Sequence, residues 1–355
     1  MRRRFRFFGK NAELTPIGKM IMEEDIAALD ATLAKEWQLD EPVSITPRCR
    51  ELAISVALVE NKLKVVDYLL SKGVELNTLG QPAICFAASG CDKVTIEKLI
   101  DAGANIKAEN TVGSNAFSRA LYSDRIELLP VFLENGLPVD ADGGKSFRQA
   151  VFNGRMDAVK FFLAEGMDPN LRTPDMVHPS NPTAVHVAAE NDNFAMVKLL
   201  VSHGADVTLD SNGGRPFHAA VANQNSAMID FIRDLEPPEW HDLGIKLKQL
   251  QSLGLSENLL EFLQREDRKI PLNTCGCSWI ELLPLLCVTK SQWQDEFVVQ
   301  LMADLDDSCS CGSLVWSPGR KKLAFIDIEH DETTWLEDWD AFITNPNLYV
   351  EKQFE

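Results

Sequence analysis

The chain has 355 residues, of which 45% are apolar and 25% are charged, and its formal net charge is −18. Such a surface repels phosphate backbones and anionic lipid head groups, so duplex nucleic acid and membranes are excluded as natural partners and a basic protein is favoured. No apolar run in the sequence approaches the length of a membrane-spanning helix.

Residues 1–12 form the one basic island in this acidic chain. Arg2-Arg3-Arg4-Phe5 resembles the start of a twin-arginine export signal, but no apolar segment with a small-residue cleavage site follows it. We therefore expect a cytoplasmic protein whose disordered basic tip folds over the acidic body.

The next two thirds of the chain repeat one pattern with a period near thirty residues. In five copies a glycine follows 18 residues after one position of the repeat, and we call the residue at that position the register residue. The five pairs of register residue and glycine are Ser55 and Gly73, Cys85 and Gly103, Ser118 and Gly136, Arg148 and Gly166, and His186 and Gly204. In every copy an alanine follows two residues after the register residue, and two apolar residues stand three and four positions before the glycine. This fixed register predicts a stack of similar units rather than a generic helical protein.

The clearest copy, residues 181–210, predicts two short helices. The first covers Ala184–Glu190 and is rich in alanine, which lets a neighbouring helix approach closely. The second covers Phe194–His203, where apolar residues recur at helical spacing. Gly204 follows directly, where a helix end favours a left-handed residue without a Cβ atom.

This pattern resembles the ankyrin repeat. The family's signature, threonine-proline-leucine-histidine-any-alanine, is matched in part at Thr183, Val185, His186 and Ala188, and again in the run Arg215–Ala220. Gly204-Ala205-Asp206-Val207 is similar to the family's turn. The resemblance implies an α-helical solenoid of helix pairs with protruding loops, a fold that the family uses almost wholly to bind proteins. It also implies that His186 and His218 bond to loop backbone, which favours a structural role over a catalytic one.

Both ends of the series depart from the pattern. Leu14-Thr15-Pro16-Ile17 opens like the signature, but Gly18 takes the histidine position and Glu36 that of the turn glycine, so we interpret this copy as an N-terminal cap. Pro42–Pro47 is then a longer loop into the next copy. A sixth copy begins at Gly213 and loses its turn at Glu236, where two prolines stop the helix. We predict a solenoid over residues 13–240, with about seven repeats including the caps.

Two groups of residues are candidates for partner binding. An insertion, Arg172–Ser180, separates the fourth and fifth copies, and an insertion in a solenoid lies on a loop, often on the binding side; a tolerated surface loop is the alternative. Its candidates are Arg172, Asp175, Met176 and His178. The tips of the other loops add Asn77, Asn110, Asp140, Asp142, Asp206, Asp210 and Asn212. The acidity of these tips favours a basic partner.

Residues 241–355 have lost the register and predict an α+β domain. We expect helices at Ser256–Arg265, with Ser256 as N-cap, and at Trp279–Cys287. Ser313–Trp316 and Leu323–Asp327 look like two strands joined by a turn. A closing amphipathic helix is expected to carry Trp335, Leu336, Trp339, Phe342 and Ile343 on one face.

The order of these elements is similar to that of the SUKH superfamily of bacterial immunity proteins. The resemblance lies in Glu257–Leu263, Ile280–Leu285, Leu314–Trp316, Phe325–Asp327 and Trp339–Phe342. It implies that the protein neutralises a toxin, commonly a nuclease, delivered by a neighbouring cell.

Four cysteines of this domain could form a tetrahedral zinc site: Cys275, Cys277, Cys309 and Cys311. Zinc knuckles usually have two residues between their cysteines and these pairs have one, so reduced thiols without a metal are the favoured interpretation. The acidic run Asp327–Glu332 could also hold a metal, but a charge run beside a strand end is more often a solvated face. We expect no cofactor.

Three functions remain. The main expectation is a non-enzymatic immunity protein that occludes a basic toxin by direct binding, with electrostatic steering of the encounter. The alternative is a generic ankyrin scaffold or adaptor that binds several proteins weakly. The third is an enzyme within residues 241–355, which no nucleophile motif, phosphate loop or standard metal motif supports.

Overall fold

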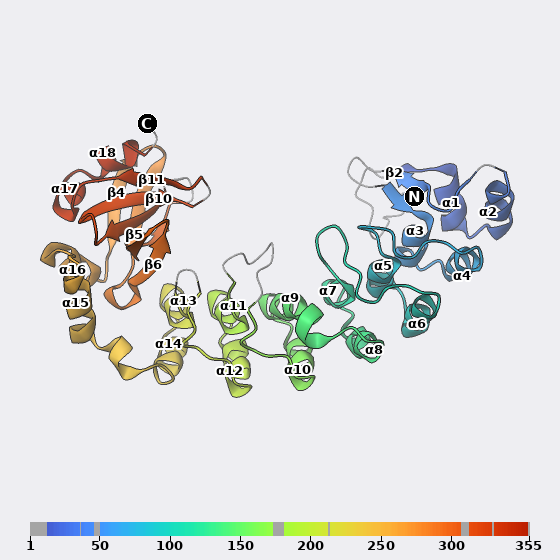
Figure 1. Cartoon of the computed structure of the whole chain (residues 1–355), viewed down its shortest axis with the longest axis horizontal. Coiled ribbons are helices and arrows are strands. Elements are labelled where there is room, and N and C mark those ends of the chain that lie inside the picture. Colours follow the sequence, from blue (N-terminus) through green and yellow to red (C-terminus); the bar gives the residue numbers. More distant parts are fainter. Residues whose placement is uncertain are drawn as a thin grey trace. The chain divides into compact units, whose positions relative to one another are not determined.

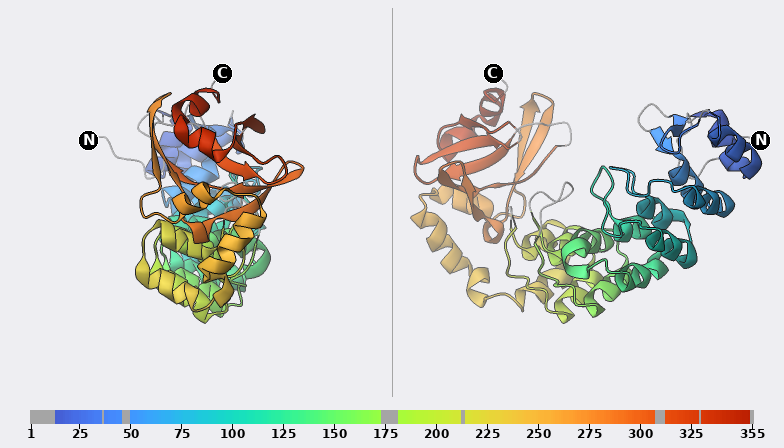
Figure 2. Two further views of the ribbon diagram at one scale, coloured as in Figure 1. Left: turned by 90° about the vertical axis from the view of Figure 1, so that its left-hand side faces the viewer. Right: turned by 45° about the vertical axis from the view of Figure 1, so that its right-hand side comes forward.

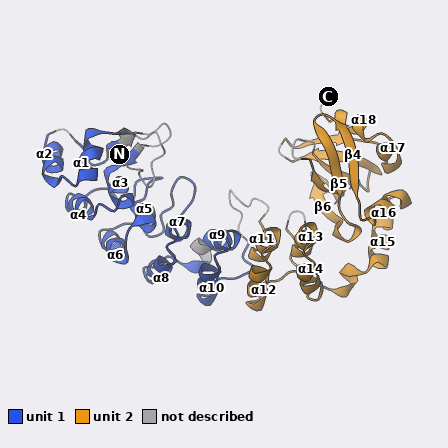
Figure 3. Ribbon diagram, turned by 180° about the vertical axis from the view of Figure 1, so that it is seen from behind, with its two compact units in different colours: residues 1–173 blue, residues 174–355 orange. Residues whose placement is uncertain are grey.

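The computed structural model of the chain describes residues 13–35, 37–45, 50–172, 181–211, 214–306, 312–328 and 330–353. The chain divides into two compact units, residues 1–173 and 174–355, which Figure 3 distinguishes by colour. This division lies inside the predicted insertion. The domain boundary that we expect at residue 240 lies within the second unit and stays a prediction.

The first unit begins with a helix pair and a small antiparallel sheet. The pair is α1 (Pro16–Glu23) with α2 (Ile26–Leu33), and the sheet has the order β1 (Glu13–Leu14), β2 (Pro42–Ile45), β3 (Arg50–Leu52). Strand β2 therefore forms where we expected an open loop. The Thr15 hydroxyl accepts from Gly18 N at 3.2 Å and donates to the Val43 carbonyl at 2.8 Å. A Cβ atom at position 18 would lie 2.5 Å from that carbonyl oxygen, which explains the glycine.

Four more helix pairs follow in the first unit. They are α3 (Ala53–Val59) with α4 (Leu63–Ser71), α5 (Ala83–Gly90) with α6 (Lys93–Asp101), α7 (Ala116–Tyr122) with η1 (Ile126–Leu128) and α8 (Leu129–Glu134), and α9 (Val139–Phe152) with α10 (Met156–Ala164). Their first helices, which we call the inner helices, pack in series from α3 to α9 (Figures 1 and 2). The predicted turn glycines are left-handed, with φ from 74° at Gly73 to 96° at Gly103.

The core of the first unit follows the register read from the sequence. The alanines Ala57, Ala87, Ala120 and Ala150 are 0% exposed, so adjacent inner helices approach closely. Phenylalanines fill the space around α7 and α9: the ring of Phe162 lies 5.5 Å from that of Phe117 and 6.0 Å from that of Phe147, edge to face. Such pairs add to the stabilisation from burial.

We expected Asp140 and Asp142 at a loop tip, but the structure places them in a helix. Both lie in α9, whose first residue Val139 follows an extended Pro138. This helix begins earlier than the first helices of the other copies, which start two residues before the register residue.

The second unit contains the last two helix pairs and the C-terminal region. The pairs are α11 (Ala184–Glu190) with α12 (Phe194–Ser202), and α13 (Pro216–Ala222) with α14 (Ser226–Arg233). Both helices expected in the clearest copy are confirmed, and Gly204 has φ 91°. The short 3₁₀ helix η2 (Pro238–His241) follows the two prolines, and α15 (Leu243–Ser252) and α16 (Glu257–Leu263) come next.

Two antiparallel sheets complete the C-terminal region. The first contains β4 (Lys269–Thr274), β5 (Cys277–Leu282) and β8 (Met302–Leu305) in that order. The second has the order β11 (Glu332–Trp335), β10 (Lys322–Asp327), β9 (Ser313–Ser317), β7 (Glu296–Gln300), β6 (Thr289–Trp293). Helices α17 (Trp339–Thr344) and α18 (Pro346–Glu351) lie beside the sheets (Figure 1). The Thr274 hydroxyl on β4 donates to Glu351 at 2.6 Å.

Two expectations for this region are wrong. Residues 279–287 form the end of β5 and a 3₁₀ turn, η3 (Leu285–Cys287), instead of a helix. Ile280 and Leu282 are buried while Trp279 and Glu281 are only partly buried, so the alternating pattern of a strand was taken for a helical one. The closing helix begins only at Trp339, capped by Asp338, whereas Trp335 pairs with Ala324 in the sheet. The helix with Ser256 as N-cap and the strand pair β9 and β10 are confirmed.

Replacement of a core phenylalanine tests the packing between repeats. We expect Phe162→Ala to lower the free energy of unfolding by about 3–5 kcal/mol, because the side chain is 0% exposed and contacts three other rings. Phe152→Ala is the matched control, since Phe152 is 50% exposed and its loss should cost less than about 1 kcal/mol. Urea titration measures both. Equal losses would show that the exposed ring is as firmly packed as the buried one.

Candidate protein-binding surface

The inner helices of the first unit expose two aromatic side chains. Tyr122, the last residue of α7, is 75% exposed, and Phe152, the last residue of α9, is 50% exposed. Each stands four residues after the register residue of its copy, and α7 packs on α9, so the two lie at equivalent places on neighbouring helices. Large exposed rings of this kind are typical of protein interfaces.

Arg119 lies beside one of these rings. Its guanidinium lies 5.9 Å from the centre of the Tyr122 ring, close enough for a cation–π contact. The same group donates to the Ser89 hydroxyl on α5, from Nε at 3.2 Å and from Nη2 at 2.9 Å. Burial lowers the pKa of the Arg119 guanidinium. A tyrosine and a half-buried arginine fixed together are the residue types that dominate binding energy at interfaces.

The loops between the helix pairs are linked to one another. Leu79 is 99% exposed and Val112 is 56% exposed, each at a turn with a left-handed glycine after it. The backbone of Gly80 forms a bridge with Asn110 of the next loop. Lys145 then donates to the carbonyls of Val112 at 3.2 Å and Gly113 at 2.8 Å. Apolar tips are thus presented on loops that adjacent repeats hold in position.

Several candidates from the sequence are engaged within the chain. The Asn77 amide donates to the Gly103 carbonyl at 3.0 Å and accepts from Asn105 N at 2.7 Å, so it joins two repeats. Asn110 Oδ1 accepts from the backbone of Val112 and Ser114 and closes its own loop. Asp206 Oδ1 accepts from the backbone and hydroxyl of Thr208, at 2.8 and 2.6 Å. Partner binding by these side chains stays a prediction.

The remaining candidates are placed less fully. Arg172 and Asp210 are exposed. Asp175, Met176, His178 and Asn212 lie outside the described residues. The greater part of the predicted insertion, residues 173–180, also lies outside the described residues, so its role in partner binding stays a prediction.

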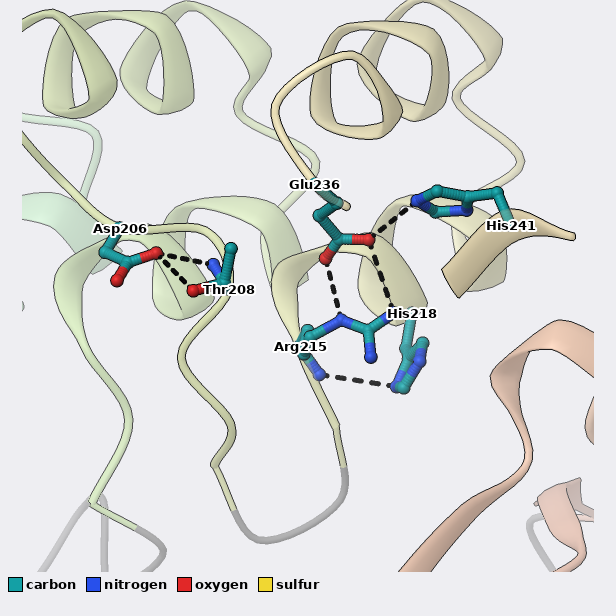
Figure 4. A network of polar contacts seen from close by, with 6 residues as sticks. All are labelled: Asp206, Thr208, Arg215, His218, Glu236 and His241. Carbon is teal, nitrogen blue, oxygen red and sulfur yellow. Dashed lines mark hydrogen bonds and ion pairs between the residues drawn. The ribbon is translucent and has the colours of Figure 1, made fainter. Parts of the chain in front are cut away.

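The two signature histidines have structural surroundings. His186 is 3% exposed, and its Nδ1 lies 2.7 Å from the hydroxyl of Thr183, the residue that caps α11. At the equivalent place in the next copy, Arg215 N donates to His218 Nδ1 at 3.3 Å (Figure 4). Each imidazole thus binds the residue at the start of its own inner helix.

A buried ion pair stands where the last repeat ends. The Glu236 carboxylate has a fully buried side chain and accepts from Arg215 Nε at 2.7 Å, with His241 Nε2 at 2.9 Å (Figure 4). Burial raises the pKa of Glu236, and hydrogen bonding to Arg215 opposes that rise. Burial also lowers the pKa of His241, as do the guanidinium groups of Arg215 and Arg233. The residue that replaces the turn glycine in this copy therefore ties the last repeat to η2.

Two of the four cysteines considered for a zinc site, Cys275 and Cys277, lie among the described residues. Cys277 is disulfide-bonded, so it is neither a reduced thiol, as we expected, nor a thiolate ligand. Cys275 is a free, exposed cysteine, and Cys309 and Cys311 lie outside the described residues. Among the described residues, no group of three or more histidine, cysteine or acidic side chains is arranged to hold a metal ion.

Within the part of the chain that the structure describes, no helix combines the length and apolar character needed to cross a bilayer.

Comparisons with known proteins show which proteins the repeats resemble. Residues 147–237 match the family model described as ankyrin repeats (3 copies). The chain is 25% identical over 182 residues to the putative ankyrin repeat protein FPV031 of fowlpox virus, covering 48% of this chain and 50% of that protein. It is also 25% identical over 231 residues to the B-cell lymphoma 3 protein homolog of Mus musculus, covering 62% of this chain and 50% of that protein. The chain thus spans half the length of each of these relatives.

A solved structure agrees on the fold. The ankyrin repeat domain of Bcl-3 has a TM-score of 0.50 and 24% sequence identity to this chain, and the match covers 62% of this chain and 98% of that domain. The protein is an ankyrin repeat protein whose helical repeat region precedes a β-rich C-terminal region with helices. Ankyrin repeat domains are typically non-catalytic binding modules.

The sequence analysis did not single out Tyr122 and Phe152, because it considered only loop residues as candidates for partner binding. The available signal is their register: the same position holds Val59 and Ser89 in the two preceding copies and Glu190 in the next. Val59 is buried at this position while Glu190 is exposed, so a polar residue in some copies indicates a position that is not in the core of every repeat.

Removing one partner of the buried ion pair tests its role. We expect Arg215→Met to lower the free energy of unfolding by about 3–5 kcal/mol, because it leaves the Glu236 carboxylate buried beside a neutral imidazole. The double variant Arg215→Met, Glu236→Leu should recover most of that loss. Arg155→Met, which breaks an exposed pair with Asp124, is the control and should cost less than about 1 kcal/mol. Urea titration measures the free energy of unfolding of all three variants. A double variant that is no more stable than Arg215→Met would contradict a stabilising role for Arg215 as the partner of a buried charge.

Proposed function

We propose that the protein is a scaffold that binds another protein on the inner helices and loop tips of its first unit. The observation that supports this function most strongly is the exposed pair Tyr122 and Phe152 on neighbouring inner helices, with the Arg119 guanidinium 5.9 Å from the centre of the first ring. A fold used for protein binding, aromatic anchors and loops that hold each other in place together support this function better than catalysis.

The interface is proposed to have an apolar centre. Aromatic anchors contribute most binding energy when the partner covers them completely and excludes water. The half-buried guanidinium of Arg119 adds a directional donor beside them. Leu79 and Val112, on loop tips that are fixed to each other, would extend the apolar contact beyond the inner helices.

A basic toxin is the second candidate partner. The net charge of −18 favours a basic protein, and the SUKH-like order of the C-terminal elements adds the expectation of an immunity protein. The comparisons support the scaffold and give no support to the immunity role or to the SUKH resemblance. That hypothesis rests on charge and on element order alone.

Two aromatic truncations test the proposed surface. The wild-type protein isolates the partner from a lysate of the source organism, and binding is then measured by surface plasmon resonance with the purified partner. We expect Tyr122→Ala and Phe152→Ala each to weaken affinity by about tenfold or more, mainly through faster dissociation. Phe297→Ala removes a ring that is 66% exposed in the C-terminal region and should leave affinity unchanged. Weakening by the control alone would move the site to the C-terminal region.

Charge reversal separates the toxin hypothesis from the general scaffold. If the partner is basic, lysine at Asp140, Asp142, Asp206 and Asp210 should slow association at low salt and leave dissociation nearly unchanged. The control reverses four exposed acids of the C-terminal region: Glu257, Asp295, Glu332 and Glu337. An association rate unchanged at low salt in the first variant would contradict a basic partner on the repeats.

A further inference from the structure

A pocket of about 370 Å³ lies within the second unit, between the last repeat and the C-terminal region. Phe217, Val221 and Ile229 line it from α13 and α14, while Leu263 and Leu286 line it from α16 and η3. This volume lies in the range of small-molecule sites, which favour junctions between domains and are lined mainly by apolar side chains.

Three arginines surround this apolar space: Arg233, Arg265 and Arg268. None of the described residues that line the pocket is acidic. The described lining residues thus carry positive and no negative charge, although the chain as a whole has a net charge of −18. This lining favours an anionic ligand.

The three arginines differ in how far they are already neutralised. The Arg268 guanidinium donates to the carbonyls of Arg265 at 2.6 Å and Leu282 at 3.1 Å, and lies 3.6 Å from Glu281. Arg233 pairs with Asp230 at 2.9 Å. Arg265 stacks on Phe262, at 4.9 Å from the ring centre, and forms no ion pair with the described residues. Arg265 is thus a fixed cation available to a ligand.

The chemistry of the pocket points to binding rather than reaction. Cys287 is the one potential nucleophile among the described lining residues, and burial raises the pKa of its thiol to about 12. A thiol in that state is not a nucleophile at neutral pH. Arginine side chains do not ligate metals, which leaves charge pairing and apolar contact as the available interactions.

We propose that this pocket binds a small amphipathic anion, with its apolar body between the last repeat and the C-terminal region and its carboxylate on Arg265. A carboxylate accepts two parallel hydrogen bonds from one guanidinium, which fixes its orientation. Because the last repeat and the C-terminal region both line the pocket, the ligand stabilises their contact and raises the apparent stability of the folded chain.

Decanoate is the probe that tests this site, with decanol as the matched neutral compound. Isothermal titration calorimetry of the full chain, below the aggregation concentration of either compound, should give saturable 1:1 binding of decanoate and at least about tenfold weaker binding of decanol. Arg265→Gln should weaken decanoate binding by about tenfold and leave decanol binding unchanged. Arg320→Gln, an exposed arginine of the β9–β10 turn outside the pocket, should change neither.

A second variant protects the test against a folding defect. Val221→Trp places a large side chain in the apolar part of the pocket and should abolish the rise in Tm that decanoate gives the wild-type chain, while the variant still unfolds cooperatively. The proposal is overturned if decanoate does not saturate a single site. It is also overturned if decanoate and decanol bind equally and Arg265→Gln leaves both unchanged, which would mean adventitious apolar binding only.

Discussion

A helix pair of this size cannot bury its apolar face alone, and the rest of the structure depends on that constraint. Stacking solves it in each unit: an alanine two positions after the register residue lets adjacent inner helices approach, and the left-handed glycine returns the chain for the next pair. The end pairs then need other cover. In the first unit α1 and a three-stranded sheet lie beside α3 while α2 lies beside α4, and in the second unit η2 and α15 follow α14.

The same constraint does not commit every position of an inner helix to the core. Four residues after the register residue, Val59 is buried but Tyr122 is exposed. Tyr122 and Phe152 occupy that position in neighbouring copies. The end of the repeat series shows a related freedom, because Glu236 replaces a turn glycine and joins Arg215 and His241 in a buried network. The variable residues of the repeats and the altered last copy thus have roles other than packing one repeat on the next.

The repeat helices could be predicted from the sequence because their signal recurs in five copies, and the fixed offset to Gly73 or Gly204 left little choice of boundary. The C-terminal region offers no such recurrence. There, Ile280 and Leu282 fit a helix and a strand equally well in a short window, and pairing with β4 and β8 decides the strand. The polar residues at the loop tips predicted the partner-binding surface only in part. Asn77 and Asn110, for example, form hydrogen bonds that link or close the loops themselves.

Hydrogen exchange on the complex with the isolated partner tests the central claim most directly, because it reports where backbone amides become protected without any substitution. The account predicts added protection in the inner helices α7 and α9, around Tyr122 and Phe152, and in the loops near Val112. Protection confined to residues 243–353, with the exchange of α7 and α9 unchanged, would contradict a protein-binding surface on the repeats.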